Sequence, residues 1–81
     1  IGMSKYFATY FDGKIRSNTL CPGGVENGQD EEFLKKLKNL IPLGRLAKVD
    51  EYKGTLIYML SDASAYMNGS ILTVDGGRTS W

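Results

Sequence analysis

The chain has no histidine and only one cysteine among its 81 residues, and both scarcities restrict its chemistry. Without histidine, neither a Ser-His-Asp nor a Cys-His catalytic arrangement can form within the chain. The single cysteine, Cys21, cannot close an internal disulfide, and the residue types present do not favour a structural zinc site. We therefore expect no metal site and expect Cys21 to be a small buried residue at the end of a strand.

Strong charge and long apolar runs are also missing. The formal net charge is +1, so the chain lacks the basic surface that nucleic-acid binding requires. Its apolar runs are too short to cross a bilayer, and residues 1–11 do not have the pattern of a signal peptide. A lone cysteine is typical of a reducing compartment. We expect a cytoplasmic protein without nucleic-acid or membrane partners.

The most informative segment is 60–77, in which a helix ends and a short strand follows. Gly69 precedes the apolar run Ile71–Val74, and Asp75-Gly76-Gly77 ends that run. Short apolar runs between turn residues are typical of buried strands in parallel sheets. The sequence therefore predicts a buried last strand within residues 70–77.

Four further elements are predicted before this strand. In chain order they are a helix tail over 1–13, a strand with a Pro-Gly turn over 15–24, a loop and helix over 25–41, and a helix over 50–60. Gly13 is a candidate C′ residue, and Asp30 is a candidate N-cap. Gly54 lies inside the last helix, where glycine costs about 1 kcal/mol against alanine and usually permits a close backbone approach.

The predicted order indicates an α/β fold. Two strands separated by helices require a crossover, which makes the strands parallel and the crossover right-handed. A parallel sheet needs helices on both faces, and two strands with three helices cannot complete one. The first helix begins mid-pattern at Ile1 without an N-cap signal. We therefore expect upstream residues and interpret the chain as the C-terminal edge of a larger sheet.

Five stretches resemble the C-terminal part of the short-chain dehydrogenase/reductase family. They are Ile15–Gly23 with its Pro-Gly turn, Pro42-Leu43-Gly44-Arg45, Asp50-Glu51, Leu60–Ser64 with Tyr66 and Gly69, and Val74-Asp75-Gly76-Gly77. Each is common alone, but together they span most of the chain at suitable spacing. The resemblance implies a Rossmann-type doubly wound parallel sheet. It also implies an NAD(P)-dependent oxidoreductase that transfers hydride between a nicotinamide cofactor and an alcohol or carbonyl substrate.

The same resemblance implies which functional residues this chain holds. The family's catalytic tyrosine, lysine and serine would precede Ile1, so no catalytic residue is expected here and the chain alone should be inactive. The implied cofactor-binding residues are Pro22, Gly23, Gly24, Val25 and Asn27, with Asn27 standing where the family commonly has threonine. The cofactor is NAD or NADP, because the residues that choose between them are not in this segment. Residues 25–41 correspond to the family's variable substrate lid, and their sequence does not identify the substrate.

Other interpretations remain open. The chain also fits a catalytically inactive scaffold or an assembly module of the same fold. Family members associate through their last helix and strand, which implies a homodimer or homotetramer through residues 50–60 and 71–74. Judged without the family, Pro22-Gly23-Gly24 is better explained as a plain strand stop. Arg45 has three candidate partners, namely Asp50, Glu51 and Asp75.

Overall fold

The computed structural model describes all residues, 1–81, and contains three α-helices and two strands. In chain order these are α1 (Gly2–Tyr10), β1 (Thr19–Pro22), α2 (Glu31–Lys38), α3 (Lys53–Leu60) and β2 (Ile71–Val74). Three short 3-10 turns accompany them: η1 (Val49–Tyr52), η2 (Asp62–Ser64) and η3 (Arg78–Ser80). The last of these lies in the tail that follows β2.

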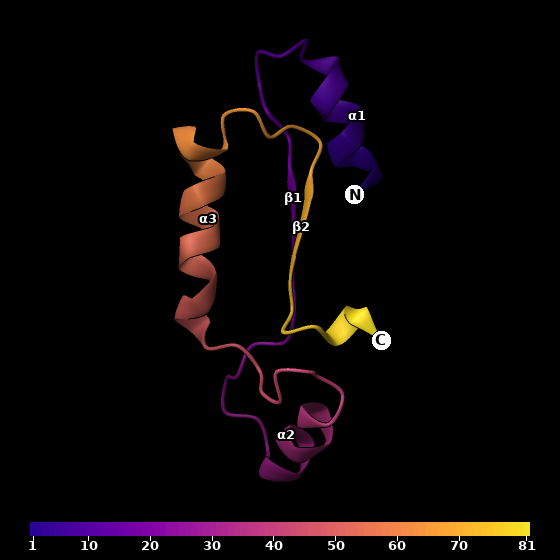
Figure 1. The fold of residues 1–81 in the computed structure, drawn as a ribbon, viewed down its shortest axis with the longest axis vertical. Helices are drawn as coiled ribbons and strands as arrows, with labels where there is room; N and C mark the ends of the chain where they lie inside the picture. The colour runs from indigo at the N-terminus through magenta and orange to yellow at the C-terminus, as the bar shows by residue number, and fades with distance from the viewer.

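The two strands pair in parallel, as predicted. The register aligns Thr19 with Ile71 and Pro22 with Val74. Figure 1 shows the strands running side by side, with α1 and α3 on opposite sides of the pair and α2 beyond one end. Parallel strands with helices on both sides are the arrangement of an α/β sheet.

Strand β1 begins at Thr19, four residues later than the predicted start at Ile15. Gly69 has a φ of +74°, so the backbone turns just before β2 and cannot continue the ladder. The Ser17 N–H donates instead to Oδ1 of Asn68 at 3.0 Å, and the Ser17 carbonyl accepts from the Gly69 N–H at 2.8 Å. A side-chain amide thus replaces the pairing that the sequence pattern predicted.

The helix ends also differ in detail from the predictions. After α1, Asp12 is the first residue with a left-handed φ, at 54°, followed by the predicted C′ residue Gly13 at 79°. Asp30 caps α2 as expected, since its carboxylate accepts from the Glu32 N–H at 3.4 Å. Helix α2 then ends at Lys38, earlier than Ile41. None of the helices combines the length and apolar character needed to cross a membrane.

The buried core of the chain is small. Only Ile41, Leu46 and Ser64 are buried, at 6%, 5% and 2% exposure. The prediction of a buried last strand is therefore wrong for this chain, since β2 alternates between exposed and half-buried residues, and Cys21 is likewise only half-buried. The radius of gyration is 15.4 Å, against about 12 Å for a compact domain of this length. Much apolar surface stays exposed because the two strands and three helices do not pack against enough other elements to bury it.

Helix α3 contributes several residues to that open surface. Ile57 is 68% exposed and Leu60 is 84% exposed. A Cβ atom added at Gly54 would meet nothing within 4 Å. The close backbone approach predicted at Gly54 is therefore not made within this chain.

Side chains close the end of the strand pair at which both strands begin. Arg16 donates from Nη1 to the carbonyls of Ser64 at 2.8 Å and Met67 at 3.0 Å, and from Nη2 to the carbonyl of Met59 at 3.2 Å. Asn68 donates from Nδ2 to the Ala8 carbonyl at 2.8 Å, which connects this end to α1. We call this end, built around Arg16, Asn18 and Asn68, the amino-end latch.

Candidate functional site

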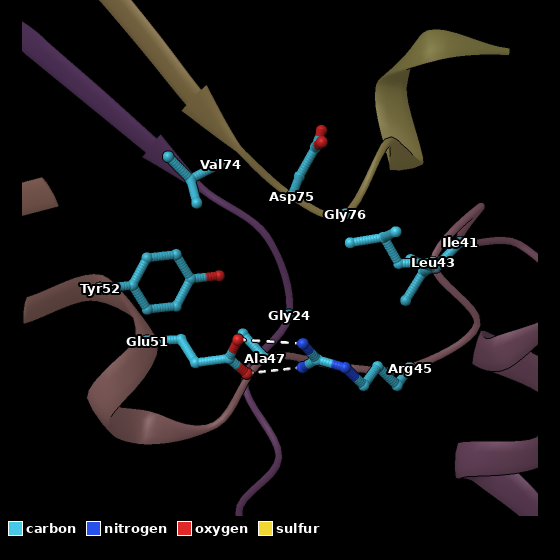
Figure 2. Close-up of a pocket in the computed structure, with 10 residues that line it drawn as sticks. All are labelled: Gly24, Ile41, Leu43, Arg45, Ala47, Glu51, Tyr52, Val74, Asp75 and Gly76. Carbon is cyan, nitrogen blue, oxygen red and sulfur yellow. Dashed lines mark hydrogen bonds and ion pairs between the residues drawn. The ribbon is translucent and has the colours of Figure 1, made fainter. Parts of the chain in front are cut away.

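The candidate site lies at the carboxyl ends of β1 and β2. The chain leaves β1 through Gly23-Gly24 and leaves β2 through Asp75-Gly76. In open α/β sheets, ligands bind in the crevice outside the carboxyl ends of the strands. Figure 2 shows these turns facing Tyr52 and the paired side chains of Arg45 and Glu51.

The two strand exits are packed against each other, and this packing explains the glycine at position 23. A Cβ atom on Gly23 would lie 2.8 Å from both Cα and Cβ of Asp75, and one on Gly24 would lie 2.7 Å from Cδ2 of Leu46. Neither glycine has a positive φ. Glycine at position 23 is therefore required by its close approach to the Asp75 backbone and not by a left-handed conformation, whereas the Leu46 side chain could move away from a Cβ atom at position 24.

Most backbone groups of this turn are hydrogen-bonded within the chain. The Gly23 N–H donates to the Val74 carbonyl at 2.9 Å, and the Gly23 carbonyl accepts from the Tyr52 hydroxyl at 3.2 Å. The Ala47 N–H donates to the Gly24 carbonyl at 3.1 Å, and the Ala47 carbonyl accepts from the Glu26 N–H at 2.8 Å. The Gly24 and Val25 N–H groups have no partner in the chain. Two consecutive donors are thus free in a turn that is otherwise paired.

The predicted cofactor residues divide into a contiguous turn and one outlying side chain. Pro22 ends β1 and is exposed, and Gly23, Gly24 and Val25 continue directly from it. Asn27 lies two residues further on, with its backbone N–H bound to Oε1 of Gln29 at 2.6 Å. The Asn27 side chain is exposed and makes no hydrogen bond, so its amide is available to a ligand.

An ion pair fixes the segment that faces the turn. Nη1 and Nη2 of Arg45 lie 2.5 and 3.0 Å from the two carboxylate oxygens of Glu51, which selects Glu51 from the three candidate partners. Oε1 of Glu51 also accepts from the Lys48 N–H at 2.9 Å. The hydrogen bond from Arg45, followed by the one from Lys48, lowers the pKa of Glu51 to about 2. The same hydrogen bond raises the pKa of Arg45.

Asp75 shapes the turn after β2. Its carboxylate accepts from the Thr79 hydroxyl at 2.7 Å, the Gly77 N–H at 2.9 Å and the Thr79 N–H at 3.2 Å. These bonds, that of the Thr79 hydroxyl foremost, hold the pKa of Asp75 below its usual range. A carboxylate that accepts this many hydrogen bonds stays ionised, which makes Asp75 a structural group and a poor general base.

The tail after Asp75 contacts the segment that follows α2. A Cβ atom on Gly77 would lie 2.8 Å from Cγ of Pro42, so only glycine fits this contact. Nε1 of Trp81 donates to the Leu40 carbonyl at 2.6 Å. The downstream end of the predicted lid is therefore tied to the end of β2.

A cavity of about 110 Å³ lies between these turns. Its lining residues are Gly24, Ile41, Leu43, Arg45, Ala47, Glu51, Tyr52, Val74, Asp75 and Gly76. Sites for drug-sized ligands usually measure roughly 300–1,000 Å³. The cavity formed by these residues is therefore smaller than a typical ligand site.

Two polar residues of this architecture were missed from the sequence. Tyr52 falls within the helix predicted over 50–60 and was given no polar role, yet its hydroxyl reaches the Gly23 carbonyl. Arg16 was counted as part of a strand, yet it binds three carbonyls. A phenol within an apolar stripe, or one charge within a half-buried run, is the available signal, because such groups need a partner.

Comparisons with known proteins agree with this geometry. A family model described as enoyl-(acyl carrier protein) reductase matches residues 1–79. D-threitol dehydrogenase of Mycolicibacterium smegmatis is 38% identical over 85 residues, covering 98% of this chain and 33% of that protein.

Two solved structures show the same likeness in three dimensions. A gluconate 5-dehydrogenase from Burkholderia cenocepacia, in complex with NADP and tartrate, has a TM-score of 0.87 and 36% identity, over 99% of this chain and 34% of that one. A short-chain dehydrogenase from Leptospira borgpetersenii with bound NAD+ has a TM-score of 0.90 and 33% identity, over 96% of this chain and 31% of that one.

Each of these relatives matches nearly the whole of this chain. The chain spans about a third of the length of these relatives. The family model covers nearly all of the chain, and the fold agrees with that of the solved structures. The chain belongs to the short-chain dehydrogenase/reductase family.

Proposed function

We propose that the chain is the C-terminal part of an NAD(P)-dependent oxidoreductase that transfers hydride between a nicotinamide cofactor and an alcohol or carbonyl substrate. Similar proteins with bound NADP and NAD+ support this proposal. The observation that carries it is the pair of free N–H groups on Gly24 and Val25 at the carboxyl end of β1. Polar backbone donors that are left unpaired in an otherwise paired turn are suited to a ligand.

The segment Pro22–Val25, here called the nicotinamide-side turn, fits a carboxamide. Its two free N–H groups can donate to the carboxamide oxygen. The Val25 carbonyl accepts from Nε2 of Gln29 at 2.8 Å and keeps a second lone pair for the carboxamide NH₂. Asn27 adds a free side-chain amide that can bind carboxamide or phosphate oxygens. When bound, the nicotinamide supplies or accepts the hydride.

The residues of this chain would then orient the ring and contribute no proton transfer. The chain has no histidine, and the carboxylates of Glu51 and Asp75 are held ionised by hydrogen bonds. We propose that the general acid or base, with the rest of the cofactor site, comes from upstream residues. The cavity of about 110 Å³, too small to hold a whole cofactor, supports this division.

Residues 25–41 are proposed to act as the substrate lid. Helix α2 lies beyond the carboxyl ends of the strands (Figure 1), where it can cover a bound substrate. Phe33 is 50% exposed, so the helix retains an apolar surface for a substrate to contact. Lids that exclude water strengthen the electrostatic interactions inside a site.

We further propose that α3 and β2 form a contact between copies in a homodimer or homotetramer. The exposed Ile57 and Leu60 and the open surface at Gly54 support this role. The lone, free Cys21 favours a reducing cytoplasm. The alternative is a catalytically inactive scaffold or assembly module that keeps the same surfaces. An upstream Tyr-x-x-x-Lys sequence would favour the enzyme, and its absence would favour the scaffold.

The full-length protein tests the proposal through a matched pair of substitutions. Val25→Pro removes a donor that has no partner in the chain, whereas Val25→Ala shortens the side chain and keeps the N–H. Calorimetry with NADH and NADPH should show at least a tenfold loss of affinity for Val25→Pro, roughly the effect of one strong hydrogen bond. Val25→Ala should bind nearly normally. If the unmodified protein binds neither cofactor and no nicotinamide absorbance change occurs with alcohols or ketones, the enzyme proposal fails.

A further inference from the structure

We infer that Tyr52 is a positioning residue for the nicotinamide-side turn, an inference that rests on the proposed function. Its hydroxyl donates to the Gly23 carbonyl at 3.2 Å. The side chain is half-buried and points toward Gly24 across the cavity (Figure 2). Tyr52 would not touch the cofactor itself and would act through the backbone that it holds.

Peptide geometry connects this hydrogen bond to the free donor. The Gly23 carbonyl and the Gly24 N–H belong to one peptide unit, which is trans like every other in the chain. In a planar trans unit the C=O and N–H bonds point in opposite directions. A hydroxyl that holds the Gly23 oxygen therefore also directs the free Gly24 N–H away from Tyr52.

The next peptide unit is held in the same way. The Ala47 N–H binds the Gly24 carbonyl at 3.1 Å, which directs the free Val25 N–H away from Ala47. Both anchors come from one segment, 47–52, which the Arg45–Glu51 ion pair and the Lys48 N–H bond brace. Each free donor thus faces away from the segment that anchors its peptide unit.

The first unit needs such an anchor more than the second. It has glycine on both sides, and glycine allows the widest range of backbone rotation. Without the Tyr52 hydroxyl, the unit would be limited only indirectly, through the packing of Gly23 on Asp75 and the backbone bonds of the Gly23 N–H and the Gly24 carbonyl on either side of it. Donors that are oriented before binding cost less to order when the ligand arrives. Tyr52 therefore raises cofactor affinity by fixing one donor in advance.

Tyr52→Phe in the full-length protein tests this role, with Tyr58→Phe as the matched control. Both substitutions remove one phenolic hydroxyl, but the Tyr58 hydroxyl makes no hydrogen bond in the chain. We expect Tyr52→Phe to weaken binding of the preferred cofactor about two- to tenfold, the range that one neutral hydrogen bond gives. The KM for the cofactor should rise accordingly with kcat little changed, and Tyr58→Phe should match the unmodified protein.

The outcomes separate this inference from the proposed function. A role confined to stability would lower the melting temperature and leave the dissociation constant unchanged, because losing one hydrogen bond leaves nearly every molecule folded. That result, or equal weakening by Tyr58→Phe, would overturn the inference and leave the proposed function intact. If the unmodified protein binds neither NADH nor NADPH, both fail together.

Discussion

The two ends of the strand pair satisfy their backbone groups in opposite ways. At the amino-end latch, side chains do the pairing: Nδ2 of Asn18 donates to the Met67 carbonyl at 2.9 Å, and its Oδ1 accepts from the Ser70 N–H at 3.0 Å. At the carboxyl ends, glycines allow the backbones to approach, and the Gly24 and Val25 N–H groups stay free. The same two strands thus have one closed end that serves stability and one open end suited to a ligand.

The largest expected effect is at the closed end. Arg16→Ala should lower the free energy of unfolding by about 3 kcal/mol, because three carbonyls lose a charged donor. Urea unfolding of the full-length protein measures this loss. Arg78→Ala, which removes an exposed arginine without side-chain hydrogen bonds, should change little. Cofactor affinity should be unchanged by Arg16→Ala. A loss of affinity as large as that expected for Val25→Pro would contradict the proposed difference between the two ends.

At the open end, Gly23→Ala should cost about 2 kcal/mol, a typical cost of overpacking. The new Cβ would meet the Asp75 backbone at 2.8 Å, and a backbone cannot swing away as a side chain can. Because the strand exits must separate, cofactor affinity should fall along with the melting temperature. Unchanged affinity would show that the turn tolerates displacement and that the open end is not preorganised.

A smaller effect of opposite sign is expected at Gly54. Gly54→Ala should stabilise α3 by about 1 kcal/mol, because alanine is the better helix former and no atom within 4 Å opposes it. Thermal melting measures the gain, and sedimentation measures the assembly. Dissociation of an oligomer by this substitution would instead mean that a second copy approaches the glycine closely.

The smallest effect concerns the acid range. The pKa of Glu51 in the folded state, about 2, lies below its ordinary value. The ionised carboxylate therefore contributes fully to the free energy of unfolding above the ordinary pKa range of a carboxyl group, and this contribution is lost as the pH falls toward 2. Glu51→Gln should flatten this part of the stability profile. The ion pair is partly exposed, so its contribution should also shrink as salt is added. Asp50→Asn is the control, because the Asp50 carboxylate makes no hydrogen bond. If the free energy of unfolding falls with pH in the same way for Glu51→Gln and for the unmodified protein, Glu51 is not the group responsible.

The sequence predicts what depends on local pattern. The apolar run bounded by glycines located β2 at Ile71–Val74, and the helical spacing located the helices to within a few residues. The start of β1 was missed because the Asn68 amide, distant in sequence, takes the place of a strand partner. The burial of β2 was overestimated because the pattern of apolar residues shows which face of an element tends to be buried. The pattern does not show whether another element of this chain packs on that face.

The same distinction applies to the site. A Pro-Gly-Gly run predicts a turn, but the reason for its glycines, the contact of Gly23 with Asp75, joins segments far apart in the chain. Arg45 was a plausible ion-pair residue, yet spacing alone did not choose among its three partners. The hydrogen bond of Tyr52 has only a weak sequence signature, because a tyrosine among apolar residues needs a polar partner but its position does not say which one.

The bond between Trp81 and the Leu40 carbonyl has a practical use in optical experiments. This is the single tryptophan of the 81 residues, and its indole is largely exposed at 79%. Its emission should therefore respond to whether the Leu40 contact is made or broken. Stopped-flow fluorescence would show, without any attached dye, whether the contact between Trp81 and the end of the proposed lid changes when substrate is mixed in.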